Sequence, residues 1–95
     1  TPVDLAPAAR QELLEARSFY AAVTPALGER FARVIEQALR RIGSSPTLWP
    51  RVSTRLRRHV VSEFPYAILD RIEGEQVLVV AIAHQRRRFG YWQGR

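Results

Sequence analysis

The feature that most constrains the fold is one apolar run, Val77-Leu78-Val79-Val80-Ala81-Ile82-Ala83. It is rich in β-branched residues and does not alternate with polar ones, so it predicts a strand covered on both faces, inside a sheet. The run is far shorter than the roughly 20 residues that cross a bilayer. No basic segment followed by an apolar one marks the N-terminus. We therefore expect a soluble, cytoplasmic protein. Membrane binding is not expected either, because the basic residues do not lie on a helix opposite a large apolar face.

The first half of the chain predicts two helices. Apolar residues recur every three or four positions over residues 7–22, at Ala9, Leu13, Ala16 and Tyr20. Thr24 and Pro25 then supply a capping oxygen and a ring suited to a first helical turn. A second apolar stripe follows, and Gly43 with Ser44, Ser45 and Pro46 is expected to stop it. The short link between the helices predicts an antiparallel hairpin.

The second half predicts strands at residues 57–63, 66–72 and 77–83, joined by short links as an antiparallel meander. A further short strand is expected at residues 2–5, and a basic aromatic tail follows from His84 to Arg95. The fold class is therefore α+β, in which a helix hairpin packs on an antiparallel sheet in the order β-α-α-β-β-β. At 95 residues, the chain is expected to form one domain, residues 1–95, because it is too small for two cores.

Charge and composition narrow the possible functions. The 15 basic residues, all arginine, exceed the nine acidic ones and give a net charge of +6. The absence of lysine is consistent with the coding bias of a GC-rich genome. Residues 51–95 hold nine arginines against four carboxylates, which favours an anionic partner for this half. The absence of cysteine excludes disulfides, thiolate nucleophiles and cysteine-bound zinc. With two histidines and no recognisable ligand spacing, we expect no metal site and no cofactor.

Short motifs near the ends of the predicted helices and strands are similar to those of a known family. They are Val3-Asp4-Leu5-Ala6-Pro7-Ala8-Ala9, Leu27-Gly28 with Phe31, Arg57-Arg58, Phe64-Pro65-Tyr66 and His84-Gln85-Arg86-Arg87-Arg88-Phe89-Gly90-Tyr91-Trp92. The chain resembles the RelE/ParE superfamily of bacterial toxins over nearly its whole length. The last motif is the most specific, because a histidine, an arginine and Tyr-Trp end many family members.

The resemblance implies the toxin of a type II toxin-antitoxin system, linked to plasmid stabilization and growth inhibition. A cognate antitoxin is the implied partner, adding a strand to a sheet edge or laying a helix beside the hairpin. The family has two branches. RelE-like members cut messenger RNA on the ribosome, whereas ParE-like members poison DNA gyrase.

Metal-free RNA cleavage needs a base, an acid and positive charge around the phosphate. If the chain is a nuclease, the candidate catalytic residues are His84, Arg57, Arg58, Arg86 and Tyr91. RelE-like nucleases generally place lysines or a glutamate among these groups, and arginine holds its proton too firmly to act as a base. The convincing proton carriers are then few: His59, His84 and Glu63. Inhibition of gyrase by binding is therefore favoured over the endoribonuclease. A third hypothesis is an inactive toxin that only binds its antitoxin.

The candidate target-binding residues lie in the tail: Arg86, Arg87, Arg88 and Trp92. The arginines are suited to phosphate groups, and the rings of Phe89, Tyr91 and Trp92 to stacked bases. The structural alternative is that these rings close the edge of the core. His84 has an alternative role as a backbone cap. Arg57 and Arg58 must point to opposite sides of a strand, and a salt bridge to Asp70 or Glu63 is the simpler explanation of either.

Overall fold

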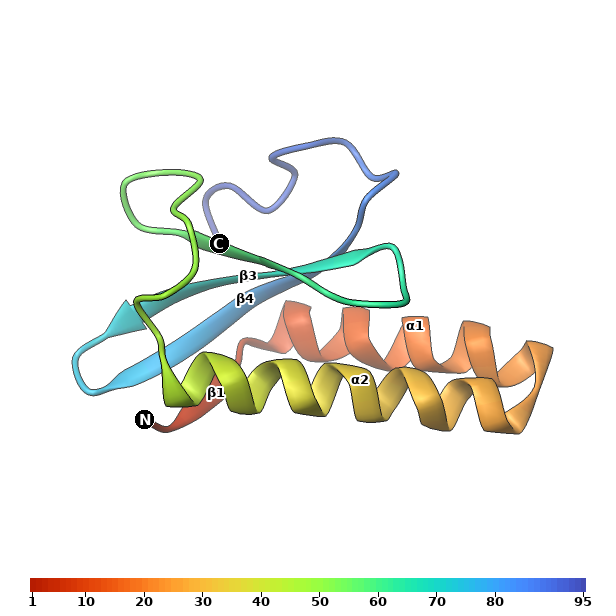
Figure 1. Cartoon of the computed structure of the whole chain (residues 1–95). Coiled ribbons are helices and arrows are strands. Elements are labelled where there is room, and N and C mark those ends of the chain that lie inside the picture. Colours follow the sequence, from red (N-terminus) through yellow and green to blue (C-terminus); the bar gives the residue numbers. More distant parts are fainter.

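The computed structural model describes residues 1–95 and has the predicted order of elements. They are β1 (Val3–Leu5), α1 (Pro7–Val23), α2 (Pro25–Ser44), β2 (Arg57–Val60), β3 (Tyr66–Glu73) and β4 (Gln76–His84). The strands form a single sheet in the order β1-β4-β3-β2 (Figure 1). The predicted α+β fold and the internal position of the apolar strand β4 are thus confirmed. β1 pairs with β4 in parallel, and the other neighbours are antiparallel.

The helix hairpin turns at one residue, Thr24, which ends α1 and caps α2. Its Oγ1 accepts a hydrogen bond from the backbone N–H of Leu27 at 3.1 Å, so one free amide of the new helix is satisfied. Gly28 lets the helices approach closely, because a Cβ there would lie 2.7 Å from the Cβ of Ala21. α1 and α2 therefore pack as the predicted antiparallel pair.

One predicted boundary is confirmed and one is wrong. α2 ends at Ser44 with Ser45 as its C-cap, inside the segment Gly43-Ser44-Ser45-Pro46 that is predicted to stop it. Gly43 itself is still helical and permits close packing: a Cβ there would lie 2.9 Å from the carbonyl oxygen of Thr1. β2 ends at Val60 rather than at residue 63, because the chain turns back at once and Glu63 adopts a positive φ of 69°.

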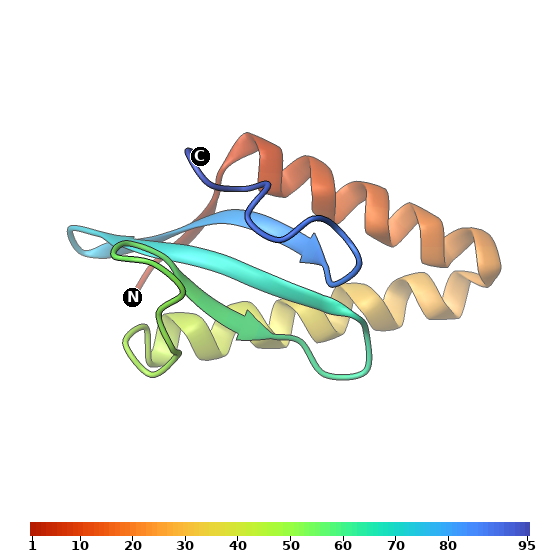
Figure 2. The same cartoon turned by 90° about the horizontal axis from the view of Figure 1, so that it is seen from above.

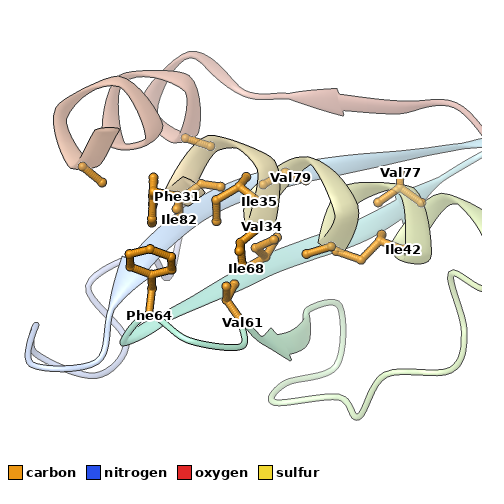
Figure 3. Packing of buried hydrophobic residues seen from close by; sticks show 13 residues of the cluster. Phe31, Val34, Ile35, Ile42, Val61, Phe64, Ile68, Val77, Val79 and Ile82 are labelled. Carbon is orange, nitrogen blue, oxygen red and sulfur yellow. The ribbon is translucent and has the colours of Figure 1, made fainter. Parts of the chain in front are cut away.

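The helices cover one face of the sheet (Figure 1). A cluster of 13 buried apolar residues, here called the helix-side cluster, lies between the helices and the sheet. It includes Phe31 and Ile35 of α2, Ile68 of β3 and Val79 of β4 (Figure 3). α1 contributes small side chains, Ala9 and Ala16, which keep it close to the strands. No helix combines the length and the apolarity that crossing a membrane requires.

The opposite face of the sheet is covered by irregular chain. The tail-side cluster consists of Leu56, Ala67, Leu69, Val80, Ala81, Ala83 and Trp92. Figures 1 and 2 show the segment before β2 and the C-terminal tail passing over this face. Both faces of β4 are therefore buried, as its apolar run predicts. The tail is consequently a structural layer, and its position is set by packing.

Candidate functional site

The carboxylate of Glu12 on α1 fixes the tail against the body of the protein. It accepts hydrogen bonds from the backbone N–H of Ile82 at 3.1 Å, from Tyr91 Oη at 2.5 Å and from Arg95 Nη1 at 2.9 Å. Arg87 Nη1 lies 3.7 Å from Glu12 Oε2, the oxygen that accepts from Tyr91. The N–H of Ile82 is free for this contact because the pairing of β1 with β4 ends before it. One carboxylate on α1 thus contacts three residues of the tail, Arg87, Tyr91 and Arg95.

Tyr91 is the tail residue held most closely by this acid. Burial raises its pKa above the ordinary tyrosine value, and the hydrogen bond to Glu12 and the negative charge of Glu12 raise it further. The guanidinium of Arg87 stacks on the ring, 3.8 Å from its centroid. The phenol therefore keeps its proton and already donates it to a fixed acceptor.

A small hollow lies between the sheet and the tail. Its volume is about 60 Å³, and the functional candidates along its wall are Arg58, His84, Arg87, Arg88, Tyr91 and Trp92. The fold therefore brings together residues from β2, the end of β4 and the tail. The hollow is far below the roughly 300–1,000 Å³ of a typical small-molecule site. Any ligand here has to dock over its rim.

His84 occupies the end of β4 and organises the turn that follows. Its Nδ1 accepts a hydrogen bond from the backbone N–H of Arg86 at 2.9 Å. The imidazole also packs edge-on against Tyr66, with ring centroids 5.0 Å apart. These contacts hold the first residues of the basic tail segment in a defined turn.

Arg57 and Arg58 lie on opposite sides of the sheet. Arg57 pairs with Asp70, which itself lies opposite Val79 of the helix-side cluster, and directly paired residues share a face. Its Nη1 donates to the carbonyl oxygens of Trp49 and Thr47 at 2.9 and 3.3 Å. Arg58 lies opposite Leu69 of the tail-side cluster. The fold therefore separates two of the proposed catalytic arginines.

The three tail arginines are exposed and differ in their partners. Arg87 contacts Glu12, whereas Arg86 and Arg88 form no ion pair or side-chain hydrogen bond. Trp92 is only 3% exposed and belongs to the sheet packing. Its neighbour Phe89 is 71% exposed and presents an aromatic face beside the free arginines.

A buried polar group lies on the helix side of the sheet. Asp70 is fully buried, and neither carboxylate oxygen has a hydrogen-bond partner. Burial raises its pKa to about 6, and the positive charge of Arg57 opposes part of this effect. Nearby on the same face, His59 packs against Trp49 with ring centroids 4.0 Å apart. Burial, and then the charge of Arg41, lower the pKa of His59.

Neither the anchoring role of Glu12 nor the full burial of Asp70 was predicted from the sequence. Nothing in the helical pattern separates Glu12 from Glu15, the other carboxylate of α1, which is exposed. Asp70 did carry a signal, because it is an acid inside an otherwise apolar strand. A third acid, Glu63, forms an ion pair with Arg30 of α2, so its partner lies on a helix and not among the basic strands.

Comparisons with known proteins agree with this architecture. The model of the family described as "ParE toxin of type II toxin-antitoxin system, parDE" matches residues 3–89. A solved structure titled "Chromosomal ParDE TA system from P. aeruginosa" superposes with a TM-score of 0.65 and 11% identity. The match covers 88% of this chain and 95% of the other, and at this identity it bears on the fold alone. No curated protein matches the sequence.

Proposed function

The chain belongs to the ParE toxin family of type II toxin-antitoxin systems, and we propose that it inhibits DNA gyrase by binding through its basic tail. Membership implies a cognate antitoxin as partner. The proposal concerns the target and the mode of action, on which the two branches of the superfamily differ. It treats the tail as a contact surface and not as a catalytic centre.

The observation that carries the proposal is that the proton carriers around the basic strands are engaged or lie away from the tail. Tyr91 donates to Glu12, His84 Nδ1 accepts from the backbone of Arg86, and Glu63 pairs with Arg30. His59 is buried on the helix side of the sheet, and the arginines keep their protons. Such a site is able to hold an anion, whereas the Tyr91 hydroxyl and His84 Nδ1 are not free to serve as acid and base on a phosphodiester.

The proposed contact surface consists of Arg86, Arg88 and Phe89. All three are exposed, and the two guanidinium groups have no internal partner. Arginines and aromatic rings are the residues that most often dominate binding energy at protein interfaces. The anchor at Glu12 holds the tail in place before binding, which lowers the entropy lost on association.

Supercoiling and cleavage assays with purified gyrase test this proposal. The wild-type toxin is expected to block supercoiling and to trap cleaved DNA, and Arg86→Ala/Arg88→Ala/Phe89→Ala to lose both effects. The control is Arg17→Ala/Arg33→Ala, which removes two exposed, unpaired arginines from the helices and should inhibit like the wild type. Undisturbed supercoiling at a high concentration of folded wild-type toxin refutes the proposal.

The second candidate function is a ribosome-dependent endoribonuclease. It is supported by the presence of Arg58, His84 and Tyr91 along one hollow. Primer extension on messenger RNA after induction would then show new cuts at defined codon positions. Those cuts should disappear in His84→Ala and Arg86→Ala. If transcripts stay intact while growth stops, this alternative is wrong.

We propose the surface around α1 and the sheet edges for the antitoxin. Leu14, Phe19 and Val23 of α1 are 53%, 65% and 64% exposed, which is unusual for large apolar side chains on one helix. Val60 on the edge strand β2 is 54% exposed. A partner helix on α1 or an added strand would cover these residues. Phe19→Ser should weaken antitoxin binding, measured by calorimetry, and leave the toxin folded.

A further inference from the structure

A second positively charged hollow lies at the other end of the sheet from His84. It has a volume of about 210 Å³ and is lined by Arg51, Thr54, Arg55, Arg57, Arg71 and Ile72. His84 lies opposite Tyr66, where β3 begins, whereas Arg71 and Ile72 lie where β3 ends. Four of the six lining residues are arginines, and none is acidic. We refer to it as the four-arginine hollow.

The fold gathers these arginines from separate segments around the edge where β2 begins. Arg57 lies on the helix side of the sheet, as described above. Arg71 lies opposite Leu78, which packs on the tail-side cluster. Figure 1 shows the segment before β2, the end of β3 and the C-terminus at the same end of the sheet. The hollow therefore opens around the sheet edge, between residues of both faces.

The loop that supplies the other two arginines is held in place by backbone contacts. Arg51 forms an isolated bridge with Arg57. The N–H of Val52 donates to the carbonyl oxygen of Leu56 at 2.9 Å, and Ser53 Oγ accepts from the N–H of Leu56 at 3.2 Å. Arg51 and Arg55 thus project from a closed turn, so their positions around the hollow are set before any ligand arrives.

The guanidinium groups retain unused donors. Arg51 and Arg55 are exposed and form no ion pair or side-chain hydrogen bond. Arg57 uses one nitrogen, Nη1, for the two loop carbonyls. Arg71 is the most engaged, because it pairs with Glu73 and donates to the carbonyl oxygen of Arg95 at 2.5 Å. Only Glu73 forms an ion pair with one of the four guanidinium groups, and Asp70, buried opposite Arg57, is the other carboxyl nearby. The remaining positive charges, above all those of Arg51 and Arg55, repel one another unless an anion joins them.

We propose that the four-arginine hollow binds a phosphate group, presented by a free nucleotide or by a nucleic-acid backbone. Each guanidinium is a planar fork that donates two parallel hydrogen bonds to an oxyanion. A phosphate offers several oxygens and accepts from more than one such fork, whereas a carboxylate offers two. The Thr54 hydroxyl adds a neutral donor in the wall. This inference is independent of the gyrase proposal, which concerns the tail arginines.

Binding of defined phosphate probes to the full chain tests the inference. The variant is Arg51→Gln/Arg55→Gln, and the control is Arg17→Gln/Arg33→Gln, which has the same change in net charge at exposed, unpaired helix positions. Pyrophosphate binding at low salt, measured by calorimetry, should weaken about tenfold or more in the variant, the effect of losing one charge-assisted hydrogen bond. The control should keep the wild-type affinity. Circular dichroism verifies that both variants are folded.

A second arm uses a short single-stranded and a short double-stranded DNA across a series of salt concentrations. If the source of the phosphate is a nucleic acid, DNA affinity falls in the variant. The slope of log K against log salt then decreases by about one for each lost phosphate contact. If the source is a free nucleotide, pyrophosphate and ATP bind less tightly to the variant while DNA binding equals that of the control. Either result supports the inference and identifies the source.

Three results overturn the inference: no saturable binding of any phosphate probe, an equal loss in the variant and the control, or loss of binding to polyglutamate but not to pyrophosphate. The last result would identify an acidic protein as the ligand. The tail variant that tests gyrase inhibition changes different residues. Failure of one proposal is therefore separable from failure of the other.

Discussion

Replacing Glu12 should release the tail and cost a large part of the stability of the protein. Glu12→Ala removes an acceptor whose side chain is 10% exposed and which satisfies the N–H of Ile82 and the hydroxyl of Tyr91. Hydrogen bonds to a charged group are worth about 1.5–3 kcal/mol each. Arg95 is more exposed, at 27%, so water replaces its contact at little cost. We therefore expect a loss of about 3–5 kcal/mol, out of a total on the order of 5–15 kcal/mol.

Urea unfolding measures this loss. With an m-value of roughly 1–1.5 kcal/mol per molar urea, the midpoint should fall by about 2–5 M. In a Trp49→Phe background, Trp92 is the remaining tryptophan, so its fluorescence reports on the tail. Glu12→Gln keeps the size of the side chain and should lose less, about 1–2 kcal/mol, because only the charge is removed. It should also lower the pKa of Tyr91, followed by absorbance at 295 nm, although burial keeps that pKa above the ordinary value.

The matched control is Glu15→Ala, which removes an exposed carboxylate from the same helix and should change stability by no more than about 0.5 kcal/mol. If Glu12→Ala and Glu15→Ala unfold at the same urea concentration, Glu12 does not anchor the tail. An unchanged Tyr91 titration in Glu12→Gln would contradict the same reasoning from a second observable.

Three further predictions concern packing and pH. Because the folded pKa of Asp70 is raised from 3.8 to about 6, the folded state binds the proton more tightly, so the contribution of Asp70 to stability is fully present below about pH 4 and is lost as the pH rises through about 6. Over this range the loss of stability is about 3 kcal/mol. Urea titrations at pH 4–7.5 should show a weaker pH dependence of stability in Asp70→Asn than in the wild type. An identical pH profile in the variant refutes this role of Asp70. Trp92→Ala should destabilise by about 3–5 kcal/mol in thermal or urea unfolding, whereas a loss below about 1 kcal/mol would mean that the ring is not part of the sheet packing. Gly28→Ala places a methyl group 2.7 Å from the Cβ of Ala21 and should cost about 1–3 kcal/mol; equal or greater stability by calorimetry would show that the helices separate freely.

Much of the fold was predictable from local pattern. The spacing of apolar residues over α1, the Thr24-Pro25 junction and the apolar run of β4 each determine a local structure by short-range sterics and burial. The predicted order of elements is confirmed throughout. The main boundary error is the end of β2, where the strand stops at Val60 and Glu63 adopts a positive φ of 69°. The residue types of this segment do not signal that backbone conformation, because a positive φ is uncommon for any residue other than glycine.

The candidate site was predictable in kind but not in arrangement. The sequence alone determined that the second half is basic, that a tail of arginines and aromatic rings follows β4, and that Arg57 and Arg58 must diverge. Tertiary structure decided which arginines remain free, because ion pairing depends on distances between segments that the sequence does not contain. It buried Trp92, exposed Phe89 and brought Glu12 to Tyr91 beside β4, beyond the end of β1. Local patterns specify elements, whereas the partners of a charged side chain are set when those elements pack.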